Sequence, residues 1–308
     1  MPELPTGTLT PSTGVGPERP LAGEGLAAGR LARVLAVARE NKLAAAGLIT
    51  VVFLTLFCYV GPLLYHTNET STNLLLANLP PSAAHPLGTT PEGRDELGQL
   101  MLGGQSTLEV GFAVAIIGTA FGMIWGAAAG YLGGIVDAAL MRVVDALLAI
   151  PFLFFIVLLA SITTPTLLII ILAITAASWQ STARLVRGEV LSLRTRDYVQ
   201  VSRQLGAPHR HVIVRHLVPN VTGTVVVTAT LSMADAILIY AAVAFLGLSA
   251  PPPATSWGDL LSTGINNLFD GYWWQLWPPA FAIVLIVLAV NVLGDGMHDM
   301  AEHRLERR

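Results

Sequence analysis

Few residues of this chain have the types and the spacing that chemistry requires. Asp235 is an acid inside a long apolar segment, where a carboxyl group could bind and release protons. His209, His211 and His216 lie close together, but no H-E-x-x-H spacing makes them converge on a metal ion. We therefore expect these histidines to be interfacial, and we expect no metal site.

No arrangement typical of a catalytic site is present either. Serine, histidine and aspartate all occur, but the topology derived below places them on opposite sides of a membrane. The single cysteine, Cys58, lies in an apolar run, where packing is its expected role. The sequence therefore predicts neither an enzyme nor a disulfide framework.

The elements that would carry these residues are membrane helices. Hydrophobic residues make up 53% of the chain and charged residues 12%, against about 25% charged in a soluble domain. A bilayer core of about 30 Å is crossed by about 20 apolar helical residues, whose backbone groups bond internally. The sequence predicts an all-α polytopic membrane protein with six transmembrane helices, near residues 43–65, 107–130, 143–162, 165–183, 221–247 and 277–294.

The basic residues are distributed unevenly between these runs. Of the 17 lysines and arginines, five precede the first run, seven lie between the fourth and fifth, and three follow the sixth. Because basic residues accumulate on the cytoplasmic side, both termini and segment 184–220 are predicted to be cytoplasmic. Segments 66–106 and 248–276, where only Arg94 is basic, are predicted to lie on the outer side.

These boundaries divide the chain into regions. Residues 1–32 are predicted to be a disordered cytoplasmic tail, because they are rich in proline and glycine and lack the pattern of a signal peptide. The other predicted regions are an N-terminal transmembrane helix at 33–66, an extracytoplasmic loop at 67–106, a core of five transmembrane helices at 107–297, and a cytoplasmic C-terminal tail at 298–308.

Two helical segments have informative patterns. Gly118, Gly122, Gly126 and Gly130 recur every four residues, which predicts a helix face that another backbone can approach closely. Segment 134–145 alternates apolar and polar residues as an interfacial helix does. Within it, Arg142 and Asp145 could pair at a spacing of three, or they could simply be a solvated helix end.

The long cytoplasmic loop, at 187–219, is predicted to contain two short helices joined by an elbow. The first has an amphipathic spacing and stops at glycine and proline; the second starts at Pro208 and ends at Pro219. Its apolar face could lie on the bilayer, but a projecting elbow is better suited to a groove on a cytoplasmic partner. The residues assigned to this contact are Asp197, Tyr198, Gln200, Val201, Ser202, Leu205, Gly206, Ala207, Pro208 and His209.

The loop resembles the coupling loop of permeases in binding-protein-dependent ABC importers, in particular the second permease of the dipeptide, oligopeptide and nickel group. The family pattern is Glu-Ala-Ala, three residues, Gly, nine residues, Ile-x-Leu-Pro. This chain keeps Gly206 and Pro219 but has Gln200-Val-Ser202, His216 and Val218 at the other positions. Further similar segments are Arg39-Glu-Asn-Lys-Leu-Ala44, Pro80-Pro-Ser-Ala-Ala-His-Pro-Leu-Gly-Thr89, Gly93-Arg-Asp95, Ser256-Trp-Gly258 and Asn291-Val-Leu-Gly-Asp-Gly296.

The resemblance implies a type I ABC importer permease in the bacterial cytoplasmic membrane. It implies a sister permease, two cytoplasmic ABC ATPases that bind ATP and Mg, and an extracytoplasmic substrate-binding protein, with no cofactor in this chain and no nucleic acid. Short peptides would cross between the permeases by alternating access. Leu102-Gly-Gly-Gln-Ser106 looks like an ATPase signature, but no G-x-x-x-x-G-K-[ST] phosphate loop accompanies it, so we interpret it as coincidence.

The resemblance also directs attention to the fifth run. Relatives usually have Glu at the position of Tyr240, and Asp235 lies five residues earlier, about 140° around a helix. We expect Asp235 to line the translocation path and meet the amino group of a peptide, with Tyr240 nearby. The alternative is an aspartate that bonds to a neighbouring helix for packing.

Other functions are compatible with part of the pattern. A proton-coupled secondary carrier could use Asp235, although the long cytoplasmic loop and the lack of a visible inverted repeat argue against it. An intramembrane hydrolase fits less well, because no catalytic groups share a depth. Within the importer family, nickel chelates or glutathione-like compounds remain alternatives to peptides.

Overall fold

The described part of the protein is helical. The computed structural model describes residues 42–306 apart from 152–153, 157, 159–165 and 252–253, and no strand occurs among them. The expected tail at 1–32 lies outside these residues. The main helices are α2 (Lys42–Leu64), α3 (Glu96–Leu132), α4 (Gly134–Leu148), α6 (Leu167–Leu193), α7 (Asp197–Gln204), α8 (His209–Val212), α9 (Val218–Phe245), α10 (Trp257–Asn267) and α11 (Trp277–Glu306).

Membrane-spanning length and composition are found in five stretches of the described residues. They are Lys42–Leu64, Glu96–Leu132, Leu167–Leu193, His209–Phe245 and Trp273–Asp299, and each corresponds to one predicted run. The remaining predicted run, 143–162, begins within α4 and continues into residues that lie partly outside the description. The all-α membrane fold class is confirmed.

Two predicted boundaries differ from the observed ones. Helix α3 starts at Glu96 and not at residue 107, because Asp95 caps it and the polar side chains of Gln99 and Gln105 are bonded within the protein. Gln105, for example, donates to the Cys58 carbonyl at 2.7 Å. Helix α11 continues to Glu306, so residues 298–306, which we expected as a tail, belong to it. No glycine or proline between Met297 and Glu306 stops the helix.

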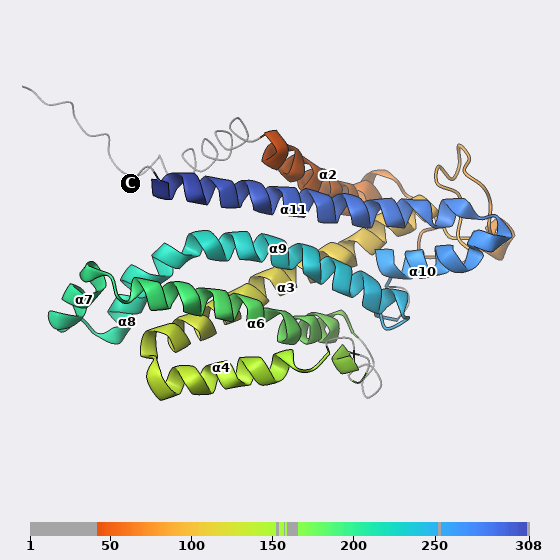
Figure 1. Cartoon of the computed structure of the whole chain (residues 1–308). Coiled ribbons are helices and arrows are strands. Elements are labelled where there is room, and N and C mark those ends of the chain that lie inside the picture. The colour runs from red at the N-terminus through yellow and green to blue at the C-terminus, as the bar shows by residue number, and fades with distance from the viewer. Residues whose placement is uncertain (1–41, 152–153, 157, 159–165, 252–253, 307–308) are drawn as a thin grey trace, which may run out of the picture.

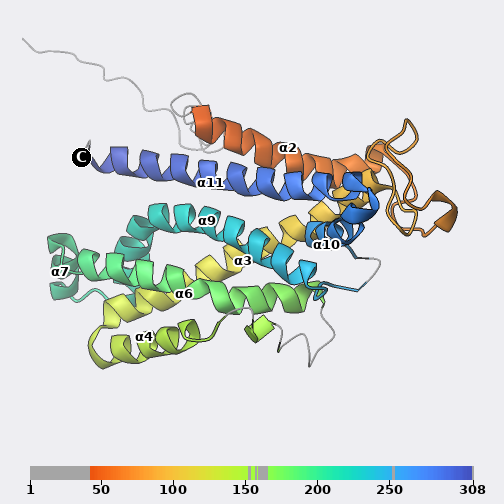
Figure 2. The same cartoon turned by 45° about the vertical axis from the view of Figure 1, so that its right-hand side comes forward.

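The long helices run between two ends of the molecule (Figures 1 and 2). One end carries α7, α8, the α3–α4 turn and the end of α11, and the start of α2 is directed towards it. The opposite end carries α10 and the segment between α2 and α3. Helix α2 lies beside α11, and α4 lies along α6 in both views. The predicted cytoplasmic and outer segments thus lie at opposite ends.

The core at the end that carries α10 forms around Trp257, at the start of this helix. Its side chain is fully buried, and its indole nitrogen donates to the Leu100 carbonyl at 2.8 Å. Cys58, also fully buried, packs in the same cluster. Because a buried indole N–H needs a partner, this bond fixes α10 against α3.

The glycine face of α3 packs against α6. A methyl group added at Gly122 would lie 2.6 Å from the Trp179 carbonyl oxygen, and one at Gly130 would lie 2.9 Å from the Arg187 carbonyl oxygen. Gly126 makes a similarly close approach to the Ala183 carbonyl, whereas Gly118 faces only side-chain atoms of Ser178 and Thr175. Close backbone approach of this kind is what small residues permit between membrane helices.

Candidate functional site

The elbow between α7 and α8 begins with a glycine-terminated helix. Gly206 has φ of +80°, its N–H donates to the Arg203 carbonyl, and the Ala207 N–H donates to the Ser202 carbonyl. This pair of bonds is a Schellman motif, which needs a residue that tolerates the left-handed region. The predicted stop at Gly206 is therefore observed.

The predicted second helix is wrong at both boundaries. Pro208 is the residue before α8 and not its first residue. The helix does not end at Pro219, because a π-helical segment, Ile213–Leu217, continues directly into α9. The Val218 N–H bonds to the Ile213 carbonyl in this wider turn. Pro219 lies in the first turn of α9, where the missing N–H of a proline is tolerated. The chain therefore remains helical from α8 through Phe245.

The apolar residues of α7 divide into an inner and an outer set. Val199 is fully buried and packs in a cluster with Val212 and Leu217 of the elbow and with residues of α3 and α6. Tyr198 and Val201 are about half exposed, and Leu205 is 82% exposed. The predicted apolar face is thus left uncovered by this chain. Sequence reasoning missed Val199, although its β-branched apolar side chain was a signal for burial.

Polar contacts connect the elbow to the end of α3. The Tyr131 hydroxyl lies 2.8 Å from Nδ1 of His209, and the Arg203 guanidinium lies over the Tyr131 ring at 5.6 Å. Arg194 donates to the Gly130 carbonyl at 3.1 Å. Of the assigned residues, His209 is exposed but bonds to α3 of its own chain.

The remaining assigned residues lie along the same segment. Asp197 starts α7, and Gln200 donates to the Thr195 carbonyl at 3.1 Å. Ser202 is half-buried and provides the carbonyl of the glycine motif. Ala207 packs partly buried against the inner cluster, and Pro208 provides the first carbonyl of α8. The structure therefore brings these residues together in one elbow, with distinct inner and outer roles.

Ion pairs attach α4 to α6. Arg187 donates to both carboxylate oxygens of Asp137, at 2.5 and 2.7 Å, and Arg184 donates to Asp145 at 2.6 Å. The hydrogen bond from Arg187 holds the pKa of Asp137 below its ordinary value. The pairing of Asp145 with Arg142 is thus replaced by a bond between helices, because α6 extends beyond its predicted end.

Asp235 and Tyr240 face different surroundings on α9. Asp235 is exposed at the surface of the subunit, whereas Tyr240 is 1% exposed and packs among Val114, Ile174 and other apolar residues. We expected Tyr240 near the path with Asp235; in this subunit its side chain is enclosed. The physical reason is the angle of about 140° between the two positions, which allows one to be buried when the other is exposed.

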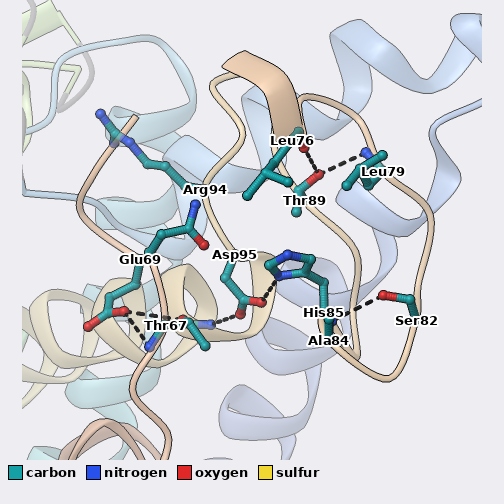
Figure 3. A network of polar contacts seen from close by, with 12 residues as sticks. Thr67, Glu69, Leu76, Leu79, Ser82, Ala84, His85, Thr89, Arg94 and Asp95 are labelled. Atoms are coloured by element: carbon teal, nitrogen blue, oxygen red, sulfur yellow. Dashed lines mark hydrogen bonds and ion pairs between the residues drawn. The ribbon is translucent and has the colours of Figure 1, made fainter. Parts of the chain in front are cut away.

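A polar network fixes the N-terminal end of α3, and the sequence did not suggest it. Asp95 is fully buried; one oxygen accepts from the Gly98 N–H at 2.9 Å, and the other lies 2.7 Å from Nδ1 of His85 (Figure 3). Tyr65 donates to Asp95 at 3.2 Å. Nearby, Gln275 donates to Asn78 and to the Thr89 carbonyl. The available signal was an aspartate directly before a long helical run.

The ATPase-like segment and the clustered histidines are not associated with a catalytic or metal site in the described structure. Leu102-Gly-Gly-Gln-Ser106 lies inside α3, far along the chain from the elbow. The His211 and His216 rings contact each other, with centroids 5.8 Å apart. Among the residues that the structure describes, no three His, Cys, Asp or Glu side chains are placed to hold one metal ion.

Together the membrane helices, the close-packed α3–α6 pair and the projecting elbow define a membrane transport subunit. Residues 118–307 match the family described as binding-protein-dependent transport system inner membrane component, and residues 30–81 match the N-terminal TM domain of oligopeptide transport permease C. The chain belongs to this permease family.

Individual relatives cover most of the chain. It is 39% identical to the dipeptide transport system permease protein DppC of Bacillus subtilis over 87% of this chain and 84% of the relative. It is 38% identical to the oligopeptide transport system permease protein OppC of Bacillus subtilis over 87% and 88% of the two chains. With OppC of Escherichia coli it shares 37% identity over 84% and 86%. These matches favour a permease over a secondary carrier or a hydrolase.

Proposed function

We propose that this chain is one of two permease subunits of an ATP-driven importer of short peptides. Its transport role follows from its family, and the peptide cargo is supported by the names of its relatives. The cargo would cross between this subunit and a sister permease after delivery by an extracytoplasmic binding protein. Two cytoplasmic ATPases, which would hold ATP and Mg, would supply the energy, and this chain would carry out no catalysis.

The observation that carries the proposal is the uncovered face of α7. Tyr198, Val201 and Leu205 present apolar surface at the end of the molecule that holds the basic loop, and this chain leaves that surface open. An exposed aromatic and aliphatic set on a short amphipathic helix is suited to a groove on a folded partner. With this end cytoplasmic, both termini would be cytoplasmic as well.

The inner contacts of the elbow would transmit the movement of the ATPases. From His209 the chain is helical through the length of α9, so a tilt of the elbow would reach the membrane without a flexible joint. The contact between Tyr131 and His209 would move α3 as well. Because α3 and α6 pack backbone to backbone, the two helices would rock as one body.

Asp235 is a candidate to meet cargo within the membrane. A charged side chain facing lipid costs about 3 kcal/mol, so an exposed carboxylate on α9 should face the sister permease or the path. In the path, it would attract the amino terminus of a peptide. Packing against the sister permease remains the alternative role.

The proposal is tested by the variant Leu205→Asp in cells that express the whole importer. A charge at this position should abolish co-purification of the ATPases with the permease, while the chain remains inserted and folded. Replacement of Asp270 by Asn, at the exposed outer end, is the matched control. Retained ATPase binding with Leu205→Asp would contradict the proposed docking face.

The energy source is tested in vesicles with a fixed ATP supply. Vanadate should stop uptake of labelled dipeptides, and a protonophore should leave it unchanged. A carrier that uses Asp235 as its proton site would give the opposite result.

A further inference from the structure

A pocket at the predicted outer end of the subunit is lined by acidic side chains, to which the proposed transport mechanism assigns no role. Its volume is about 370 Å³, and it lies between the segment that leads into α3, the segment after α9, and α10. Its ionisable lining consists of three acids, Glu92, Glu96 and Asp259, and one base, Arg94. The ionisable lining of the pocket is therefore predominantly acidic.

Glu96 is the most unusual residue of this lining. It is 1% exposed, and its Oε1 atom is buried without a hydrogen-bond partner among the described residues. A buried carboxylate oxygen with no donor is costly, and native proteins rarely keep one without a reason. Glu96 also begins α3, where an acidic side chain interacts favourably with the helix dipole. That interaction does not require burial, and it does not provide a hydrogen-bond donor for Oε1.

The second acid is held in place by hydroxyl groups. Ser249 donates to one oxygen of Asp259 at 2.6 Å, and Ser256 donates to the other at 2.7 Å. Burial raises the pKa of Asp259, and these two bonds oppose that rise. A cation in the pocket would compensate the same desolvation.

Arg94, the one basic residue of the pocket lining, does little to neutralise its acids. Arg94 directs its guanidinium to the Thr72 hydroxyl at 3.4 Å, and its Nε atom has no partner among the described residues. No ion pair joins Arg94 to Glu96 or Asp259, so these two acids lack a basic partner among the described residues.

The lining and the volume of the pocket favour an organic amine over a metal ion. No group of three acidic, histidine or cysteine side chains in the described structure converges on a metal position, so the acids line the walls and do not form a coordination shell. A cavity of about 370 Å³ is large for a single ion but accommodates an amine with an organic body. Polar side chains of Gln99, Thr255 and Gln275 also line it. Both amide N–H groups of Gln275 are already bonded, to Asn78 and to the Thr89 carbonyl.

We propose that this outer pocket binds the ammonium group of an organic cation, between Glu96 and Asp259. If the importer carries peptides, this group is the amino terminus of an arriving peptide; that assignment rests on the proposed function. The pocket would then select peptides with a free amino terminus at the entrance, before they reach the membrane.

The test measures binding by the purified full-length chain in lipid nanodiscs, without the other subunits. Calorimetric titration compares the affinities of two ligands. Glycylglycinamide carries an ammonium group, and N-acetyl-glycylglycinamide is neutral because its amino group is acetylated. The wild-type chain should bind the cation about tenfold more tightly, and Glu96→Gln and Asp259→Asn should each remove most of that preference. Asp270→Asn, which removes an acid outside the pocket, should keep it.

The two variants lie on different helices, so a local disturbance of α3 cannot explain a loss in both. Equal binding of the two ligands by the wild-type chain, or a preference that survives in both variants, would overturn the proposal. If the pocket prefers the amine but the whole importer takes up no peptide, the proposed cargo is wrong and the pocket assignment stands. Peptide uptake without any preference in the chain overturns the pocket alone.

Discussion

The hydroxyl of Tyr131, at the end of α3, lies 2.8 Å from Nδ1 of His209, the first residue of α8. The two residues are 78 positions apart in the chain. Together with Arg203 above the same ring, they join the projecting elbow to a membrane helix that the elbow does not continue into. This contact gives the elbow a second route into the membrane besides α9.

Loss of the Tyr131 hydroxyl should therefore loosen the elbow without unfolding it. Tyr131→Phe keeps the ring beneath Arg203 but removes a hydrogen bond, which contributes about 1 kcal/mol. Hydrogen exchange of the α7 and α8 amides should become about fivefold faster. Tyr272→Phe, at the outer end, serves as the control. Unchanged exchange in α7 and α8 would mean that the contact does not stabilise the elbow.

The conformation of Gly206 should be essential for coupling. A β-branched side chain at φ of +80° costs about 1–2 kcal/mol and would rotate the second half of the elbow. We expect Gly206→Val to insert normally but to lose most substrate-stimulated ATP hydrolysis in the assembled importer.

Gly188→Val provides a matched control for that experiment. Gly188 lies in α6 with no positive φ, and an added Cβ would meet nothing within 4 Å. Its replacement should therefore leave the stimulation nearly unchanged. If Gly206→Val is stimulated as well as Gly188→Val, the elbow does not transmit the movement as proposed.

The close approach of α3 to α6 should make one glycine far more sensitive than another. An added methyl at Gly122 meets a backbone carbonyl, which cannot move aside. At Gly118 it meets only side-chain atoms, the Ser178 hydroxyl at 3.2 Å and the Thr175 methyl at 3.9 Å. Gly122→Ala should lower the free energy of unfolding by about 1–3 kcal/mol, and Gly118→Ala by clearly less. Thermal unfolding of the two variants in the same detergent measures the difference. Equal stabilities would show that the helices can separate at no cost.

The role of Asp235 can be separated from packing by the choice of cargo. Asp235→Asn should reduce uptake of peptides with a free amino terminus more than uptake of N-acetylated peptides, because only the former carry the cation. Transport by the whole importer is measured, with assembly checked by co-purification. An equal loss for both kinds of peptide, or a loss of assembly, would assign Asp235 to contact with a neighbouring helix.

The effect expected of Asp235→Asn on peptide uptake can be distinguished from an effect on the outer pocket. Asp235→Asn should leave the amine preference of the isolated chain unchanged, because Asp235 lies on α9 away from the residues that line the pocket. The two acids would thus act at successive points on one route.

Several features of this protein follow from the sequence alone, because they depend on neighbouring residues in the chain. Apolar runs long enough for a bilayer predicted membrane helices, and the described residues contain five of them. The stop of α7 at Gly206 was equally local, since only glycine readily adopts the left-handed backbone that this motif needs. The recurring glycines of α3 identified a face for close packing, though not the helix that would occupy it.

The tertiary structure decided which faces are covered and which polar groups meet. Periodicity marked Tyr198, Val201 and Leu205 as one apolar face, yet the chain buries Val199 and leaves that face open. Spacing could not reveal that Pro219 would be accommodated by a π-helical turn, or that Tyr131 would reach His209. The same holds for Glu96 and Asp259, which line one pocket from helices that are distant in sequence. Local pattern sets what each segment prefers, but burial and pairing depend on surfaces that the chain brings together only when it folds.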